Sequence, residues 1–101
     1  MPRPCKRRFV SDIPEVSFFK PAGVRLRDLE EVILTVEEFE AVKLKDFMGL
    51  DQVACAEKMN VSQPTFHRIL SSARKKLADA IVNGKAIRIE GGNFALRRGR
   101  F

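Results

Sequence analysis

Fourteen residues near the middle of the chain, "EKMNVSQPTFHRIL" (57–70), restrict the fold more than any other stretch. The Ala-rich segment before them has helical spacing that stops at "MNV", and helical spacing resumes after Ser62 and Pro64. Serine is a good N-cap, and proline is tolerated in the first turn of a helix because the amide it lacks would have no partner there. The stretch therefore predicts a tight turn between two packed helices.

The residues around this turn meet the demands of a helix-turn-helix. The first helix needs a small side chain where the second helix crosses it, and Ala56 supplies one. The turn needs a residue that tolerates a positive φ, and Asn60 is the next best choice after glycine. Val61 follows as an apolar side chain that can fill the core. We therefore assign Ala56, Asn60 and Val61 to the structural turn.

Helical spacing on both sides of the turn predicts a core of three helices. The first covers residues 35–49, where Thr35 and Glu38 have the spacing of a capping box. The second covers residues 51–59, and the third runs from Ser62 to the Asn-Gly pair at 83–84. The apolar side chains expected to pack together are Val36, Phe39, Val42 (or the stem of Lys43), Leu44 and Phe47 in the first helix, Val53, Ala56 and Met59 in the second, and Phe66, Ile69, Leu70, Ala73, Leu77, Ala80 and Ile81 in the third.

Residues 1–34 have the composition of an arm, because four prolines interrupt them. Within this arm "RRFV" (7–10) is the one short strand expected, "FFKPAGV" (18–24) is expected to be a loop, and "LRDLEEVIL" (26–34) to be at most a short helical turn. Beyond the helices, the alternation in "KAIRIEGG" (85–92) predicts a short strand, for which "RRFV" is the expected partner.

These elements predict a mainly α fold in a single globular unit. Its parts are a proline-rich N-terminal arm (1–34), a helix-turn-helix domain (35–84), and a short C-terminal strand with a basic tail (85–101).

The distribution of charge indicates a polyanionic partner. Residues 1–10 carry four basic and no acidic side chains. Residues 11–60 carry six basic and eleven acidic ones, and residues 61–101 carry nine basic and two acidic ones. A basic surface gains free energy on a nucleic acid because phosphates release condensed counterions when they are neutralised. The two basic flanks therefore favour double-stranded DNA as the partner, although charged chain ends on any folded protein would give the same counts.

The outward N-terminal side of the third helix carries side chains that suit base edges. Glutamine suits adenine, arginine suits guanine, and the threonine methyl group suits thymine in the major groove. The residues predicted to contact bases are Gln63, Thr65, His67 and Arg68. The residues predicted to contact the DNA backbone are Ser62, Arg74, Lys75, Lys76, Arg7 and Arg8. The alternative is a helical hairpin whose basic face is only solvated, with His67 as an ordinary surface residue.

Catalytic chemistry is not expected. His67 is the single histidine, and no triad, metal-ligand spacing or phosphate-binding glycine loop is present in the sequence. Cys5 and Cys55 are far apart and without paired spacing, so we expect reduced thiols, and we expect no metal or other cofactor. The sequence has no signal peptide and no apolar run of membrane-spanning length, which favours the cytoplasm, beside the nucleoid.

The segment "LDQVACAEKMNVSQPTFHRILSSARKKL" (50–77) resembles region 4 of bacterial sigma factors and related response-regulator domains. Residues 1 to about 94 resemble the uncharacterised protein family 0251 (domain of unknown function 134), through "MPRP", "FFKPAGV", "LEEVILTVEEFEAVKLKD", "VSQPTFHRIL" and "ARKKLADAIVNGKAIRIEGGNF". The resemblance implies a winged-helix-like DNA-binding domain with a sigma-region-4-like helix-turn-helix, acting in transcription regulation. The chain departs from the family pattern at Asn60, Gln63 and His67, where Gly, Arg and Gly are frequent. These departures include predicted base-contacting residues, so they argue against carrying over a target sequence from the family, but they do not affect the expected fold.

Two other partners stay open at this point. A sigma-like domain can bind RNA polymerase, and Glu37, Glu38 and Glu40 of the first helix would offer a surface to a basic partner. Many helix-turn-helix proteins also dimerise to cover two half-sites. The C-terminal half of the third helix or the terminal strand could form the interface of such a homodimer.

Overall fold

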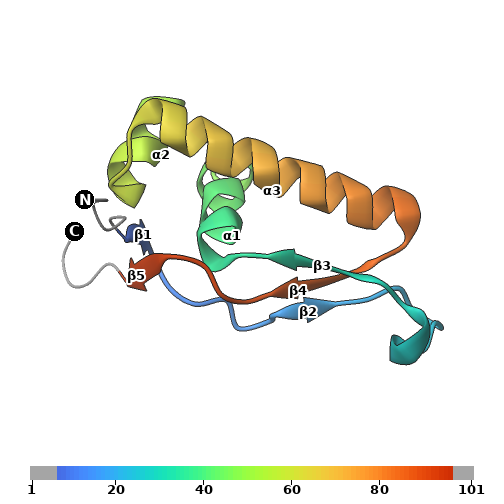
Figure 1. Ribbon diagram of the computed structural model, residues 1–101. Coiled ribbons are helices and arrows are strands. Elements are labelled where there is room, and N and C mark those ends of the chain that lie inside the picture. The colour runs from blue at the N-terminus through green and yellow to red at the C-terminus, as the bar shows by residue number, and fades with distance from the viewer. Residues whose placement is uncertain (1–6, 97–101) are drawn as a thin grey trace, which may run out of the picture.

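The computed structural model describes residues 7–96 of the 101-residue chain. Helices lie over a layer of short strands, and the longest helix runs along the outer side of the helical layer (Figure 1). The helical elements are η1 (Leu26–Asp28, a 3-10 turn), α1 (Val36–Val42), η2 (Lys43–Phe47, a π-helical turn), α2 (Gln52–Met59) and α3 (Gln63–Asn83). The strands are β1 (Arg8–Val10), β2 (Phe18–Phe19), β3 (Glu31–Leu34), β4 (Ala86–Ile89) and β5 (Phe94–Leu96). No helix within residues 7–96 has both the length and the apolar character that a membrane span requires.

The start of each main helix confirms a prediction from the sequence. Thr35 and Glu38 form the capping box: the Glu38 amide donates to Thr35 Oγ1 (3.2 Å), and the Thr35 amide donates to Glu38 Oε1 (2.9 Å). Asp51 accepts from the Ala54 amide at 2.8 Å, and Ser62 caps α3. The first helix is shorter than the predicted 35–49, because the chain leaves α-helical geometry after Val42 and continues as η2.

The turn between α2 and α3 has the predicted conformation. Asn60 has φ 58° and ψ 46°, and within residues 7–96 it is the one residue other than glycine at positive φ. The Asn60 and Val61 amides both donate to the Ala56 carbonyl, Val61 at 3.0 Å, and together they close the C-terminal end of α2. Ala56 is buried, and Val61 packs against the same apolar cluster.

The apolar side chains form two adjoining clusters. One lies between α1, η2, α2 and α3 and comprises Ala41, Leu44, Cys55, Ala56, Met59, Phe66 and Leu70. The other lies between the helices and the strands and comprises Val10, Leu34, Val36, Ala73 and Ile89. Both clusters include residues of α3, so this helix joins the helical packing to the strand layer.

Three residues predicted to pack in the core are exposed instead. Phe47 is 85% exposed because it lies in η2, where π-helical geometry changes the direction of each side chain relative to α1. Val53 is 49% exposed because the buried side of α2 is formed by Cys55, Ala56 and Met59. Ile81, at 78% exposed, borders an open pocket near the end of α3.

The strand layer differs from the prediction in its pairings. β4 is the central strand of a three-stranded sheet, antiparallel to β2 and parallel to β3, whereas β1 pairs in parallel with β5. The prediction that residues 7–10 pair with residues 85–92 is therefore wrong. The loop predicted at Phe18–Phe19 is also wrong, because these residues form β2. The short helical turn expected within residues 26–34 is present as η1, and β3, which follows it, was not predicted. In β3, Val32 and Leu34 are buried and the alternate residues are exposed, which is a strand pattern.

Arg88 joins the three strands of this sheet on one face. Its guanidinium donates to both carboxylate oxygens of Glu31 on β3, at 3.0 and 2.9 Å. It also lies 4.6 Å from the centre of the Phe18 ring on β2, which is a cation–π distance. Strands β2 and β3 of the N-terminal segment are thus joined to β4 by side-chain as well as backbone contacts.

The Gly91–Gly92 pair lets the loop after β4 approach α1 closely. The Gly91 carbonyl accepts from the Val36 amide (3.1 Å), and the Asn93 amide donates to Glu37 Oε1 (2.8 Å). Gly92 has φ +104°, and a Cβ atom there would lie 2.1 Å from Glu37 Oε1. An alanine at this position would have to displace the Glu37 carboxylate and would also crowd Thr35 Cβ (2.9 Å), in a backbone conformation that favours glycine.

We expect Gly92→Ala to lower the free energy of unfolding by about 2–3 kcal/mol, measured by urea denaturation. A left-handed backbone conformation costs an alanine about 1–2 kcal/mol, and displacing the Glu37 carboxylate loses about 1 kcal/mol of hydrogen bonding. Gly91→Ala is the matched control, because Gly91 also has positive φ (75°) but has nothing within 4 Å of its added Cβ. Equal losses in the two variants would show that the contact with Glu37 is unimportant.

Asn60 gives a second test, with two substitutions at one exposed position. Asn60→Gly is expected to be neutral or slightly stabilising, because glycine adopts positive φ without a Cβ penalty. Asn60→Val is expected to lower the free energy of unfolding by about 1–2 kcal/mol. A melting temperature unchanged by valine would contradict the left-handed turn.

Candidate nucleic-acid interface

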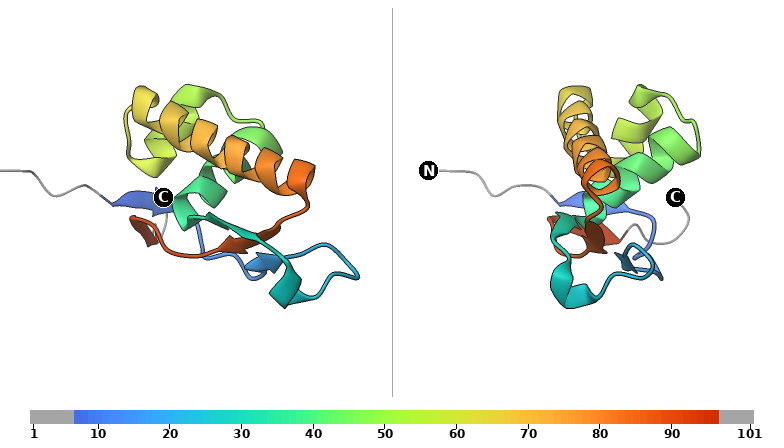
Figure 2. Two further views of the ribbon diagram at one scale, coloured as in Figure 1. Left: turned by 45° about the vertical axis from the view of Figure 1, so that its right-hand side comes forward. Right: turned by 90° about the vertical axis from the view of Figure 1, so that its right-hand side faces the viewer.

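The N-terminal half of α3 has one buried and one exposed side. Phe66 and Leu70 are buried in the cluster with α1 and α2, and Ala73 is buried in the cluster with Val36 and the strands. Figure 2 shows the opposite side of the helix uncovered by any other element of the described chain. The exposed side chains on it include His67, Arg68, Ser71, Arg74 and Lys75.

The guanidinium of Arg68 is held at the beginning of α3 by the hydroxyl of Thr65, which also accepts from Ser62. Ser62 Oγ donates to Thr65 Oγ1 (3.0 Å), and Arg68 Nη2 also donates to Thr65 Oγ1 (3.2 Å). Ser62 Oγ in turn accepts from the Thr65 amide, as the N-cap of the helix. Thr65 is half-buried and its hydroxyl is already hydrogen-bonded, so it positions Arg68. Its side chain is less exposed to solvent than those of Gln63, His67 and Arg68.

Gln63 and His67 lie beside this arginine with their side chains exposed. The Gln63 carbonyl accepts from Gln52 Nε2 at 3.3 Å, which connects the first residues of α2 and α3. His67 Nε2 lies 3.5 Å from Ser71 Oγ, one turn further along. The sequence prediction did not include Gln52 or Ser71. The position of Gln52 after the cap of α2, and the i, i+4 spacing of Ser71 from His67, are the signals that could have found them.

The cations predicted to contact the DNA backbone divide into two groups. Arg74 donates to Asp46 of η2 through Nε (3.0 Å) and Nη2, and Lys76 Nζ lies 2.7 Å from Glu38 Oε1. Arg8 lies 3.7 Å from Glu37. Lys75, in contrast, is exposed and makes no ion pair with another residue of 7–96. Arg7 is also exposed, just before β1, which Figure 1 shows on the side of the molecule where α2 lies.

The Arg74–Asp46 pair is a partly exposed contact between α3 and η2. Hydrogen bonding to Arg74 holds the pKa of Asp46 below its usual value, and the same contact raises the pKa of Arg74. Both groups therefore stay charged at any physiological pH, and the pair has no net charge. Arg74 lies on the exposed side of α3 but shares its charge with Asp46.

Glu38 has the most constrained carboxylate in the described chain. Its side chain is 8% exposed, and it accepts from the Thr35 amide, from Ser72 Oγ and from the Lys76 ammonium. Burial alone would raise the pKa of Glu38, but the hydrogen bonds from Lys76, Ser72 and Thr35 outweigh burial and hold it below 4.5. These contacts fix α1 against the middle of α3.

The acidic residues of α1 do not form the surface expected from the sequence. Glu38 and Glu40 are buried, at 6% and 1% exposed, and Glu37 faces the loop at Asn93. Ser11 donates to Glu40 Oε2 (2.6 Å), while Glu40 Oε1 has no hydrogen-bond partner among the described residues. These three carboxylates are used inside the fold, so they offer no acidic patch to a basic partner.

Residues 7–96 contain no group of three His, Cys, Asp or Glu side chains that could hold a metal ion. Cys55 is free and fully buried, with its thiol near the Leu50 carbonyl (3.7 Å). Burial raises the pKa of Cys55, which keeps it a thiol at neutral pH. Cys5 lies outside the described residues.

Comparison with known proteins gives one consistent result. A family described as "Protein of unknown function DUF134" matches residues 1–97. A UPF0251 protein of Caldanaerobacter subterraneus is 64% identical over 93% of this chain and 80% of its own length. A UPF0251 protein of Moorella thermoacetica is 62% identical over 95% of this chain and 64% of its own length. One of Dehalococcoides mccartyi is 57% identical over 95% of this chain and 82% of its own length. No solved structure matches the chain.

We expect Glu38→Gln to lower the free energy of unfolding at pH 7 by about 1–3 kcal/mol, because the amide leaves Lys76 without its counter-charge. Since the folded-state pKa of Glu38 is below its ordinary value of 4.5, the stability from this carboxylate is fully present above that pH. It is lost as the pH falls below 4.5 and through the folded-state pKa, so the difference between wild type and variant should shrink there.

Urea denaturation of both proteins at pH 7, 5, 4 and 3 measures this difference. Glu57→Gln, an exposed position on α2, is the control and should change stability by less than about 0.5 kcal/mol at every pH. A wild-type advantage over Glu38→Gln that stays constant from pH 7 to pH 3 would contradict the role assigned to the charge.

Proposed function

The chain belongs to the DUF134 family, whose UPF0251 relatives carry names that state no activity, and we propose from its geometry that it binds double-stranded DNA through a helix-turn-helix. The motif consists of α2, the turn at Asn60 and α3. It is similar to region 4 of bacterial sigma factors, and the proposed role is transcription regulation.

The exposed beginning of α3 is the observation that carries this proposal. α3 has 21 residues and is roughly 30 Å long, and the major groove of B-DNA is wide enough for one helix. The side of α3 that bears His67 and Arg68 is uncovered, while the opposite side is fixed in the core by Phe66 and Leu70. A helix held in this way can enter a groove without any rearrangement of the fold.

The proposed base contacts differ in how firmly the protein positions them. Arg68 is restrained by Thr65 and suits the O6 and N7 atoms of guanine, to which arginine donates two hydrogen bonds. Gln63 and His67 are exposed and can reach neighbouring bases. Thr65 is proposed to act mainly through Arg68, because its hydroxyl is already engaged.

The proposed phosphate contacts are fewer than the sequence alone suggests. Lys75 supplies an exposed charge on the outer side of α3, and Ser62 lies at the amino end of the helix, where the dipole favours a phosphate. Arg7 adds a charge near β1. Arg74 and Lys76 share their charges with Asp46 and Glu38, so they contribute more to positioning α3 than to attracting DNA.

Two variants separate base contacts from phosphate contacts once a preferred duplex has been selected from random DNA. Arg68→Ala should weaken binding to that duplex by about 1–3 kcal/mol and leave a scrambled duplex little changed. Lys75→Ala should weaken both duplexes alike and lower the slope of log K against log salt by about one. Fluorescence anisotropy at several salt concentrations measures both effects.

Arg27→Ala is the matched control, because it removes one exposed positive charge from η1, at the end of the molecule away from α2 (Figure 1). It should alter neither the affinity nor the salt slope beyond the small effect of net charge. If wild-type binding did not depend on salt, the DNA proposal would fail. If Arg68→Ala weakened the two duplexes equally, α3 would not be reading sequence.

A further inference from the structure

A cavity of about 280 Å³ lies between α1, α3 and the sheet. Phe39 and Val42 of α1, Leu77 of α3 and Ile87 of β4 line it, and these side chains remain partly exposed although they pack against the second apolar cluster. The volume is close to the lower end of ligand sites, about 300 Å³, and is roughly twice that of a cavity that admits benzene. The apolar packing between α1, α3 and the sheet therefore leaves a space large enough for a small molecule.

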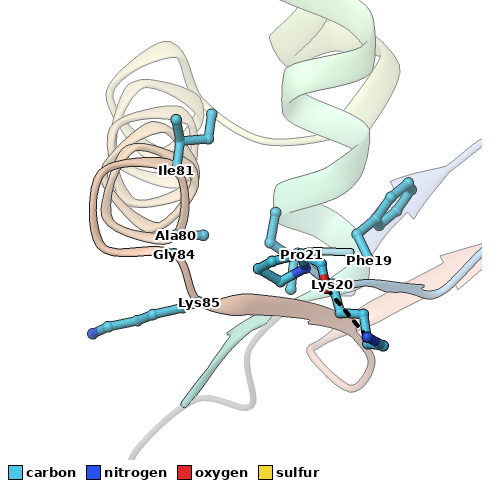
Figure 3. A pocket seen from close by; sticks show the side chains of 8 residues that line it. Phe19, Lys20, Pro21, Ala80, Ile81, Gly84 and Lys85 are labelled. Atoms are coloured by element: carbon cyan, nitrogen blue, oxygen red, sulfur yellow. Dashed lines mark hydrogen bonds between the residues drawn. The ribbon is translucent and has the colours of Figure 1, made fainter. Parts of the chain in front are cut away.

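Phe19 stands where this cavity meets two neighbouring pockets. Its side chain is 51% exposed, and it lines the cavity, a pocket under the end of α3 and a pocket beside Asp12. Figure 3 shows the pocket under α3, with Phe19 and Pro21 on one side and Ala80 and Ile81 on the other. Ile87 lines both the cavity and the pocket under α3. A molecule longer than the cavity can therefore extend past Ile87 toward Ile81.

Among residues 7–96, Lys43 is the single charged residue that lines the cavity. Its ammonium lies 3.5 Å from Asp12 Oδ1, and the Asp12 side chain is 71% exposed. Ion pairs of such exposure contribute little to stability, so a carboxylate from another molecule can replace Asp12 at small cost. The present contact thus marks the place that an acid group would take. The neighbouring pocket beside Asp12 is also lined by Glu15, and these two carboxylates would attract a cation. The charge of the bound ligand therefore distinguishes a site governed by Lys43 from one governed by Asp12 and Glu15.

From these observations we propose that the cavity binds a small amphipathic carboxylic acid. Its apolar body lies among Phe39, Leu77 and Ile87, and its carboxylate pairs with Lys43 in place of Asp12. The lining is otherwise apolar, so it gives no hydrogen bonds to a polar body, and the charge of Lys43 selects an anion. The site is on the buried side of α3, away from His67 and Arg68, so the proposal does not rest on the proposed DNA binding.

The test uses the full chain with methyl-labelled Ile, Leu and Val, titrated at pH 7 with sodium octanoate, 1-octanol or octylammonium chloride below their aggregation limits. Octanoate is expected to shift the methyl signals of Leu34, Leu77 and Ile87 in a saturable manner. 1-Octanol is expected to bind about tenfold more weakly, since it lacks the charge that pairs with Lys43. Octylammonium is expected to leave these methyl signals unchanged.

Two matched variants test the ammonium. Lys43→Met keeps the apolar stem and should weaken octanoate binding about tenfold while leaving 1-octanol binding unchanged. Lys45→Met removes the same charge from the same turn, η2, at a residue that does not line the cavity, and it should bind octanoate as wild type does. A third variant, Val42→Phe, fills the cavity and should weaken both octanoate and 1-octanol, with its fold checked by circular dichroism.

Several results would overturn the proposal. Equal affinity for octanoate and 1-octanol, or unchanged octanoate affinity in Lys43→Met, would remove the carboxylic acid as the ligand class. Preference for octylammonium would assign the site to cations held by Asp12 and Glu15. If no methyl signal of the lining shifted, the cavity would be a packing defect. If the chain formed a dimer with these methyl groups in its interface, and octanoate did not dissociate it, the cavity would be occupied by a second copy of the chain and not by a carboxylic acid.

Discussion

The carboxylate of Glu38 is the contact on which the arrangement of the helices depends. A buried carboxylate is costly unless its oxygens are hydrogen-bonded, and Glu38 satisfies them with the cap of α1 and with two residues of α3. Since Thr35 begins α1, and Ser72 and Lys76 are one turn apart on α3, the two helices are fixed in rotation as well as in distance. The rotation of α3 in turn decides which of its residues face the core and which face outward.

Local signals in the sequence were sufficient for the helices and the turn. Thr35, Asp51 and Ser62 each cap a helix because the hydrogen bond joins residues only three positions apart. Asn60 could be assigned to positive φ because few residues tolerate it. The strand pairings could not be predicted in the same way, because β2 has only two residues and the choice of partner depends on segments far apart in the chain.

Only part of the candidate interface could be predicted, because local periodicity is visible in the sequence and long-range contacts are not. The outward direction of His67 and Arg68 follows from helical periodicity once Phe66 and Leu70 are placed in the core. The roles of Arg74 and Lys76 were not predictable, because their partners lie 28 and 38 positions away in the sequence. The buried position of Glu40, with its hydroxyl partner 29 residues earlier, and the cavity beside Lys43 likewise depend on how the strand layer is assembled.

The order of the strands has a consequence for synthesis on the ribosome. β2 and β3 are joined only through β4, and β1 pairs with β5, so strands made early in translation wait for residues 86–96 before they find their partners within the described chain. α1, α2 and α3 are complete by residue 83 and can pack as soon as they emerge. Pairing between such distant segments is slow, and unpaired strand edges promote aggregation. The nascent helices therefore have to shield Val32 and Leu34 of β3 until β4 emerges, and Val10 of β1 until β5 emerges.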